Sequence, residues 1–156
     1  MIDKTDYKII AQLQRNGRLS NQELSEKVAL SPSPCLRRVR QLEKSNIIKG
    51  YTAIVDREAC GLPVMAFVSI RLEKQTDTTI QVFEEGIQEL DEIMACYLMS
   101  GTPDYVLQVL SSSLKEYERF IRDKLTQVPG IGSLETHFAY GQVKESRLFP
   151  GLSVSQ

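Results

Sequence analysis

Residues 31–51, SPSPCLRRVRQLEKSNIIKGY, combine an arginine-rich segment with a spaced apolar pattern inside one helix-sized window. Ser31 or Ser33 can cap the first turn, and Pro34 suits the first helical position, where no backbone amide is needed. Three apolar residues then recur at helical spacing and form one face: Cys35, Val39 and Leu42. The pattern therefore predicts a short helix from Ser33 to Ser45.

The remaining surface of this predicted helix is polar and mostly cationic. It carries five residues of this kind: Arg37, Arg38, Arg40, Gln41 and Lys44. Such a helix can pack its apolar face on a small core and present its charge to a polyanion. The alternative is an ordinary solvated basic face, and the helix alone does not decide between the two.

The segments before this helix favour the first interpretation. Asp3 or Thr5 can cap a helix that ends near Asn16-Gly17, and Ser20 with Glu23 forms a capping box for a second helix, which ends near Ala29. Three short helices with tight turns indicate a helix-turn-helix, whose second helix enters the major groove of DNA.

This arrangement assigns roles to the polar residues of the predicted DNA-binding helix. Arginine can donate two bonds to guanine or can bind phosphate. We expect base recognition mainly from the residues that point away from the apolar face: Ser33, Pro34, Arg37, Arg38 and Gln41. Arg40 and Lys44 are expected on the DNA backbone. Ser20, Asn21 and Gln22 could also bind phosphate, although simple helix capping explains them better.

The rest of the chain predicts a second domain of α+β class. Residues 47–56 are β-rich and are expected to form a wing. The wing would complete a DNA-binding domain over residues 1–56, and residues 57–63 are expected to form a linker. From residue 64 to 145 the expected order is strand, helix, strand, strand, helix, strand, the ferredoxin-like βαββαβ unit, followed by a tail. The predicted segments are strand 64–72, helix 80–90, strands 93–100 and 105–111, helix 114–125, strand 134–143 and tail 146–156.

Charge and composition limit the classes of function. Residues 1–60 carry 11 Lys or Arg and 7 Asp or Glu, a net charge of +4, whereas residues 61–156 carry 8 and 13, a net of −5. Only the first part is therefore expected to meet a polyanion. No apolar run approaches the ~20 residues needed to span a membrane, no signal peptide is evident, and the three cysteines fit a reducing compartment. We expect a cytoplasmic protein without contact to membranes.

The first predicted strand carries information about assembly. Alternate residues from Val64 to Leu72 are expected to face the two helices, while Met65 and Phe67 face the other side. A sheet with apolar residues on both faces usually packs against a further layer, and the chain supplies none. A homodimer would supply that layer; the alternative is that Met65 and Phe67 are isolated exposed residues.

Two blocks of sequence resemble the Lrp/AsnC (feast/famine) family of transcriptional regulators, and leucine-responsive members in particular. They are LSNQELSEKVALSPSPCLRRVRQLE, continuing into IIKGYTAIVD, and YLMSGTPDYVLQV at residues 97–109. The resemblance extends from about Ile2 to Val143. It implies a winged helix-turn-helix joined to a ferredoxin-like effector domain, dimers that often assemble into octamers, and a small effector, mostly an amino acid.

The turn Gly101-Thr102-Pro103-Asp104 is the predicted effector site. Its backbone amides can bind a carboxylate and Asp104 can accept from an ammonium group, so one turn could bind the head of an amino acid. The resemblance places the effector between dimers and implies these residues: Met99, Gly101, Thr102, Pro103, Asp104 and Tyr105, with Thr136 and Phe138 from the last strand of a neighbouring subunit. Many family members have an acidic or glycine-like residue where Thr102 and Pro103 stand. The alternative is a simple hairpin turn.

The sequence therefore predicts a regulator that binds double-stranded DNA and responds to an apolar amino acid, leucine or methionine. No nucleophile–base pair, phosphate-binding loop or metal-ligand pattern is present, so we expect no enzyme, cofactor or metal. Two other functions remain open. One is an architectural DNA-binding protein without an effector, and the other is an enzyme or its regulatory subunit that uses the ferredoxin-like half.

Overall fold

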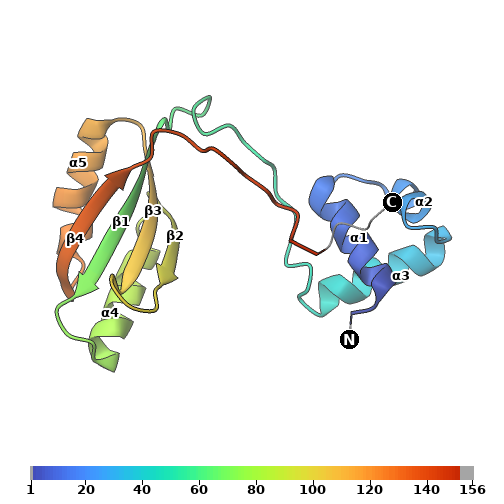
Figure 1. Cartoon of the computed structure of the whole chain (residues 1–156), viewed down its shortest axis with the longest axis horizontal. Coiled ribbons are helices and arrows are strands. Elements are labelled where there is room, and N and C mark those ends of the chain that lie inside the picture. Colours follow the sequence, from blue (N-terminus) through green and yellow to red (C-terminus); the bar gives the residue numbers. More distant parts are fainter. Residues whose placement is uncertain (1, 152–156) are drawn as a thin grey trace. The chain divides into compact units, whose positions relative to one another are not determined.

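A computed structural model of the protein describes residues 2–151. The chain forms two compact units, shown in Figure 1. Among the described residues, the helical unit contains residues 2–54 together with residues 143–151, and the sheet unit contains Val55–Gln142. Each unit has its own apolar core.

The helical unit is built from α1 (Lys4–Arg15), α2 (Asn21–Lys27) and α3 (Pro32–Lys44). Both predicted helix starts are confirmed, because Asp3 and Ser20 each cap a helix through a capping box. The apolar core cluster of the unit has five buried members, which come from all three helices and the turn after α2: Ile9, Leu24, Val28, Cys35 and Leu42. The predicted apolar face of α3 is therefore confirmed, with Val39 packed beside it.

The start of α3 differs from the prediction. Pro32, and not Pro34, occupies the first helical position, and Ser31 is the cap residue without a side-chain hydrogen bond. A capping side chain accepts from the amide of the second or third helical residue. Pro34 stands third and has no amide, which removes one of the two possible donors.

The predicted β wing is not present in the described part of the chain. α3 ends at Lys44, Asn46 just beyond it adopts φ 55°, and the residues from Lys49 to Asp56 form no strand. A β-rich segment needs a partner strand for its amides and carbonyls, and the unit provides none. Ile54 and Val55 remain exposed in this segment.

The sheet unit confirms the βαββαβ prediction. Its elements are β1 (Val64–Leu72), α4 (Asp77–Gln88), β2 (Ile93–Leu98), β3 (Tyr105–Ser111), α5 (Leu114–Asp123), a short 3₁₀ turn (Leu125–Gln127) and β4 (Ile131–Phe138). The sheet order is β2-β3-β1-β4, and every neighbouring pair is antiparallel. Ala66, Val68 and Ile70 of β1 pack against Phe83 of α4 and Phe120 of α5, so both helices cover one face.

The last strand begins and ends earlier than the predicted 134–143. Its pairing with β1 runs from Leu72 opposite Ile131 to Ala66 opposite Phe138, and β1 itself starts only two residues before Ala66. The strand therefore stops where its partner stops, and residues beyond 139 have no ladder to join.

The other face of the sheet is partly apolar, but less exposed than the sequence suggests. Phe67 is 38% exposed on this face, whereas Met65 is only 7% exposed and has the Gln108 side-chain nitrogen 3.5 Å from its sulfur. Tyr97 of β2 is also exposed. The prediction of a second apolar face therefore holds for Phe67, while the expectation that Met65 is open to water in a single chain is wrong.

Candidate DNA-binding and effector-binding sites

The outer face of α3 carries most of the predicted DNA-binding residues in an open position. Ser33, Arg37, Arg40, Gln41 and Lys44 are exposed, and Pro34 is half-buried. Within the described residues, none of these side chains takes part in a hydrogen bond or an ion pair. Their donors are therefore available to a ligand outside the chain.

Spacing places the three exposed cations of α3 on one line. Arg37, Arg40 and Lys44 follow at intervals of three and four residues, which brings them to one side of a helix. The buried residues Cys35 and Leu42 lie on the opposite side. α3 is thus fixed by one face and presents a cationic line on the other.

The single acidic residue of α3 is already engaged. Glu43 accepts a hydrogen bond of 2.9 Å from the hydroxyl of Tyr51. Partial burial, followed by the bond to Glu43, raises the pKa of Tyr51 to about 12, so the phenol stays protonated at neutral pH. Glu43 is therefore paired with a neutral donor rather than with the cations of α3.

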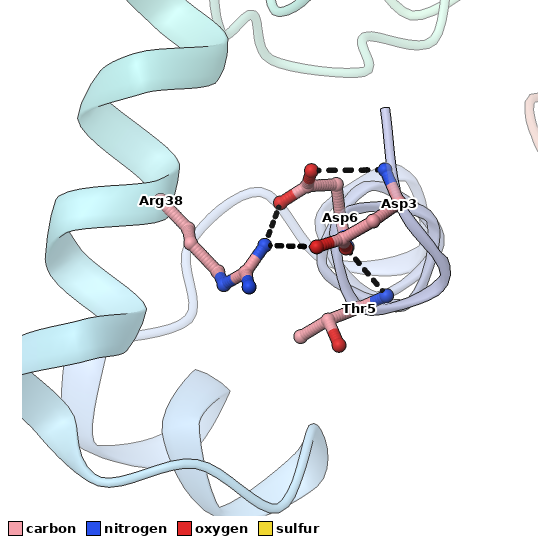
Figure 2. A network of polar contacts seen from close by, with 4 residues as sticks. All are labelled: Asp3, Thr5, Asp6 and Arg38. Atoms are coloured by element: carbon pink, nitrogen blue, oxygen red, sulfur yellow. Dashed lines mark hydrogen bonds and ion pairs between the residues drawn. The ribbon is translucent and has the colours of Figure 1, made fainter. Parts of the chain in front are cut away.

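Arg38 differs from the other arginines of α3. Its Nη1 lies 2.7 Å from Asp3 Oδ2 and 2.8 Å from Asp6 Oδ1, both at the start of α1 (Figure 2). The bonds to Asp6 and Asp3 raise the pKa of Arg38. The amide of Asp6, and then Arg38, lower the pKa of Asp3. The sequence assigned Arg38 to DNA without any signal of this pair, because its partners stand 32 and 35 positions away.

The predicted effector turn joins β2 to β3. The Met99 amide donates to the Asp104 carbonyl, 2.9 Å away, which closes the turn, and Gly101 adopts φ 113°, a conformation that side chains disfavour. Gly101 and Thr102 are exposed, and their amides donate no hydrogen bond within the described residues. The turn therefore offers backbone donors to a ligand.

The carboxylate of Asp104 faces its own chain. Its Oδ2 accepts from the Leu72 amide at 2.8 Å, and its Oδ1 accepts from the Gln75 side chain at 2.6 Å. A carboxylate can accept about four hydrogen bonds, so some capacity remains. These two bonds tie the turn to the end of β1, a role that the sequence did not indicate.

Tyr105 is directed away from the turn surface. It is 2% exposed, its ring centroid lies 4.7 Å from that of Phe83, and its hydroxyl donates to Glu84 at 2.7 Å. Burial, followed by the bond to Glu84, raises the pKa of Tyr105 strongly. Its side chain therefore belongs to the core beneath α4, and only its backbone borders the turn.

Thr136 and Phe138 lie apart from the turn within one chain. The hydroxyl of Thr136 is hydrogen-bonded to that of Tyr117 on α5 at 2.6 Å, and the rings of Phe138 and Tyr117 are 5.0 Å apart. Strand register places Phe138 opposite Ala66, at the far end of β1 from the turn. A single subunit does not bring the two predicted halves of the effector site together.

Metal sites and membrane-spanning helices are both absent from the described part of the chain. No group of three or more His, Cys, Asp or Glu residues there could hold a metal ion. Among residues 2–151, no helix has both the length and the hydropathy needed to cross a membrane.

A capped helix-turn-helix with an exposed cationic helix, joined to a ferredoxin-like sheet with an open turn, defines a two-domain DNA-binding regulator. Residues 2–49 match the model of the winged helix-turn-helix DNA-binding family, and residues 65–149 match that of the Lrp/AsnC ligand binding domain. The chain belongs to the Lrp/AsnC family of transcriptional regulators. This confirms the family expected from the sequence and a fold class of a helix-turn-helix followed by a ferredoxin-like domain.

Relatives cover nearly the whole chain. The leucine-responsive regulatory protein of Haemophilus influenzae is 39% identical over 93% of this chain and 87% of its own length, and that of Escherichia coli K12 is 37% identical over 93% and 88%. The solved complex of a Neisseria meningitidis transcriptional regulator with L-Met is 35% identical, covers 96% of this chain and 97% of its own, and has a TM-score of 0.90. An AsnC family regulator from Agrobacterium tumefaciens is 31% identical, with coverage of 95% and 96% and a TM-score of 0.89.

Proposed function

We propose that this protein regulates transcription in response to leucine or methionine, and that α3 binds operator DNA while the turn at residues 101–104 binds the effector. The observation that carries the proposal is the exposed line of Arg37, Arg40 and Lys44 on a helix whose other face is buried. A cationic helix held in this way can enter the major groove without unfolding its own core.

On the DNA, the residues of α3 have two kinds of task. Ser33, Pro34, Arg37 and Gln41 recognise base edges, with Arg37 bidentate to guanine. Arg40 and Lys44 bind phosphate, which adds affinity but little sequence information. Arg38 also belongs to the predicted DNA-binding set, but it is already paired with Asp3 and Asp6 and is assigned to neither task.

Selection of bound duplexes from a random pool tests the DNA-binding function. We expect the wild-type protein to enrich a defined motif, and its affinity to fall as salt rises because bound phosphates release counterions. A triple variant of Arg37, Arg40 and Lys44 to Gln should enrich nothing. Equal enrichment by that variant would show that another surface binds DNA.

At the effector site, the turn supplies backbone donors and Asp104 supplies negative charge. The free amides of Gly101 and Thr102 bind the carboxylate of the amino acid, and the remaining acceptor capacity of Asp104 binds its ammonium group. Pro103 shapes the turn, Tyr105 supports it from the core, and Met99 contacts the side chain of the effector. Thr136 and Phe138 are contributed by a neighbouring subunit.

The choice of leucine or methionine follows from the apolar surroundings of the turn. Met99 and Phe138 are both exposed and could cover an aliphatic or thioether side chain. The leucine-responsive relatives and the solved complex with L-Met support the same choice.

Calorimetry with the full chain tests the effector. Leucine or methionine should release or absorb heat and raise the melting temperature of the sheet unit, whereas asparagine and lysine should do neither. Heat with a polar amino acid alone would reverse the assignment. If no amino acid binds while DNA binding persists, the protein is an architectural DNA-binding protein.

The assembly we propose is a homodimer that associates further, as far as an octamer. It is supported by the exposed Phe67 and Tyr97 on the open sheet face and by the need for a second subunit at the effector site. A dimer also presents two copies of α3 to the two half-sites of an operator. Light scattering should show at least a dimer at micromolar concentration; a monomer there would contradict the proposal.

A further inference from the structure

We infer that Arg38 is a positioning residue, which fixes the orientation of α3 against α1 and does not itself contact DNA. The inference rests on the proposed function, because it concerns how the DNA-binding helix is presented. It replaces the role in base recognition that the sequence suggested for this arginine.

One nitrogen of Arg38 joins two aspartates that are themselves fixed. Nη1 lies between Asp3 Oδ2 and Asp6 Oδ1, at 2.7 and 2.8 Å (Figure 2). The other oxygen of Asp3 accepts from the amides of Thr5 and Asp6, and the other oxygen of Asp6 accepts from the Asp3 amide at 3.1 Å. Each carboxylate thus caps α1 with one oxygen and holds α3 with the other.

The pair of Arg38 with Asp3 and Asp6 fixes the rotation of α3 against α1, which apolar packing alone leaves poorly defined. Arg38 stands three residues after Cys35 and four before Leu42, at the edge of the buried face of α3, and Asp6 stands three before the buried Ile9 of α1. Apolar burial holds helices together without fixing their rotation, whereas hydrogen bonds are directional. Asp6 and Arg38 have side chains only 14% and 29% exposed, so the pair is partly shielded from water.

The local charge argues against a phosphate at this place. Arg38 contributes one positive charge and Asp3 and Asp6 contribute two negative ones, so the cluster carries a net charge of −1. Arg37, Arg40 and Lys44 have no acidic partner within the described residues. A DNA strand would therefore be attracted to the outer face of α3 and not to the Arg38 cluster.

Salt dependence separates a positioning residue from a phosphate contact. We would measure affinity for a selected duplex and for a random duplex across a salt series with wild type, Arg38→Gln, Asp6→Asn and Arg38→Lys, and with Arg40→Gln as the matched control. Loss of a phosphate contact lowers the slope of log K against log salt by about 0.9. We expect that change in Arg40→Gln and not in Arg38→Gln.

A positioning role also predicts that both sides of the pair behave alike. Arg38→Gln and Asp6→Asn should each weaken the selected duplex by roughly three- to tenfold, as for a partly exposed charge pair, and spare the random duplex. Arg38→Lys, which can still donate to both carboxylates, should restore most of the binding. The inference is overturned if Asp6→Asn leaves selected binding unchanged or strengthens it, or if Arg38→Gln flattens the salt slope.

A measurement without DNA keeps the inference separate from the proposed function. Melting of the free protein with Arg38→Gln, Asp6→Asn and the double variant should show that the two changes are not additive, since they remove one contact. If the wild-type protein binds no duplex, the proposed function fails. The non-additivity of the two changes would still show whether the contact between Arg38 and Asp6 holds α3 against α1. Additive effects would show that the pair does not hold the helices.

Discussion

On α3, the side chains of Arg37, Arg40 and Lys44 have no partner among the described residues, whereas at the turn after β2 the side chains of Asp104 and Tyr105 are both bonded within their own unit. The two proposed sites are therefore built differently. As proposed, α3 would meet its ligand with long, free side chains, and the turn would meet its ligand with a backbone that side chains hold in shape.

This difference fits what each ligand demands. DNA is large and carries its charge on a regular backbone, so flexible cations can adjust to it at little cost. A free amino acid offers few atoms, and its recognition depends on a turn whose donors are already fixed in place. Among the cations of α3, Arg38 is the exception, because like Asp104 it is bonded within its own unit. We infer that both side chains position their site.

The largest effect should come from the turn. Replacement of Asp104 by Ala leaves the Leu72 amide without its acceptor, so we expect the free energy of unfolding of the sheet unit to fall by about 1–3 kcal/mol. Thermal melting measures it, with Thr102→Ala as a control in the same turn that should change stability by at most about 0.5 kcal/mol. If Asp104→Ala melts at the same temperature as the wild type, the Asp104 carboxylate does not stabilise the turn and is free for a ligand. The contrast with α3 would then disappear.

Arg37→Ala should give the opposite result. Because Arg37 has no partner in the described chain, stability should stay within about 0.5 kcal/mol of wild type, while binding to the selected duplex falls by about 1–3 kcal/mol. Competition binding against a random duplex measures it. The matched control in the other unit is Arg71→Ala on β1, because Arg71 is also exposed and has no side-chain partner among the described residues. Equal loss on both duplexes would place Arg37 on phosphate.

Lys44→Ala should lower the affinity for DNA less than Arg37→Ala does, and it should discriminate less between the selected and the random duplex. As a phosphate contact, Lys44 would lower the affinities for selected and random duplexes by the same factor and reduce the salt slope by about 0.9. Fluorescence anisotropy at several salt concentrations measures both quantities. A loss confined to the selected duplex would move Lys44 to the base-reading group and widen the cationic line that specifies sequence.

Much of this architecture could be predicted because its causes are local. The capping pairs Asp3 with Asp6 and Ser20 with Glu23 stand three residues apart, and the apolar alternation of β1 is visible within nine residues. Such short-range patterns determined the helices of the helical unit and the succession of strands and helices along the sheet unit.

What the sequence missed depends on distant partners. Arg38 looked free because nothing near it signals Asp3 and Asp6, and Asp104 looked free because its main donor is a backbone amide, which any residue possesses. The prediction of a wing was wrong because strand formation also depends on a distant partner. The β propensity of the segment was evident, but no partner strand is present in the described part of the helical unit.

The smallest effect concerns Asp3, which caps α1 and binds Arg38. Its pKa lies below the ordinary value of 3.8, first because the Asp6 amide donates to it and then because Arg38 does. A carboxyl with a lowered pKa stabilises the folded state at pH values above its unfolded pKa of about 3.9, and this contribution is lost as the pH falls through the lower folded pKa.

An NMR titration of the Thr5 and Asp6 amides should therefore give a midpoint below 3.8 for Asp3. In Arg38→Gln the midpoint should rise but stay below that value, because the Asp6 amide remains. An unchanged midpoint would show that Arg38 does not act on Asp3 in solution, and would return Arg38 to the free cations of α3.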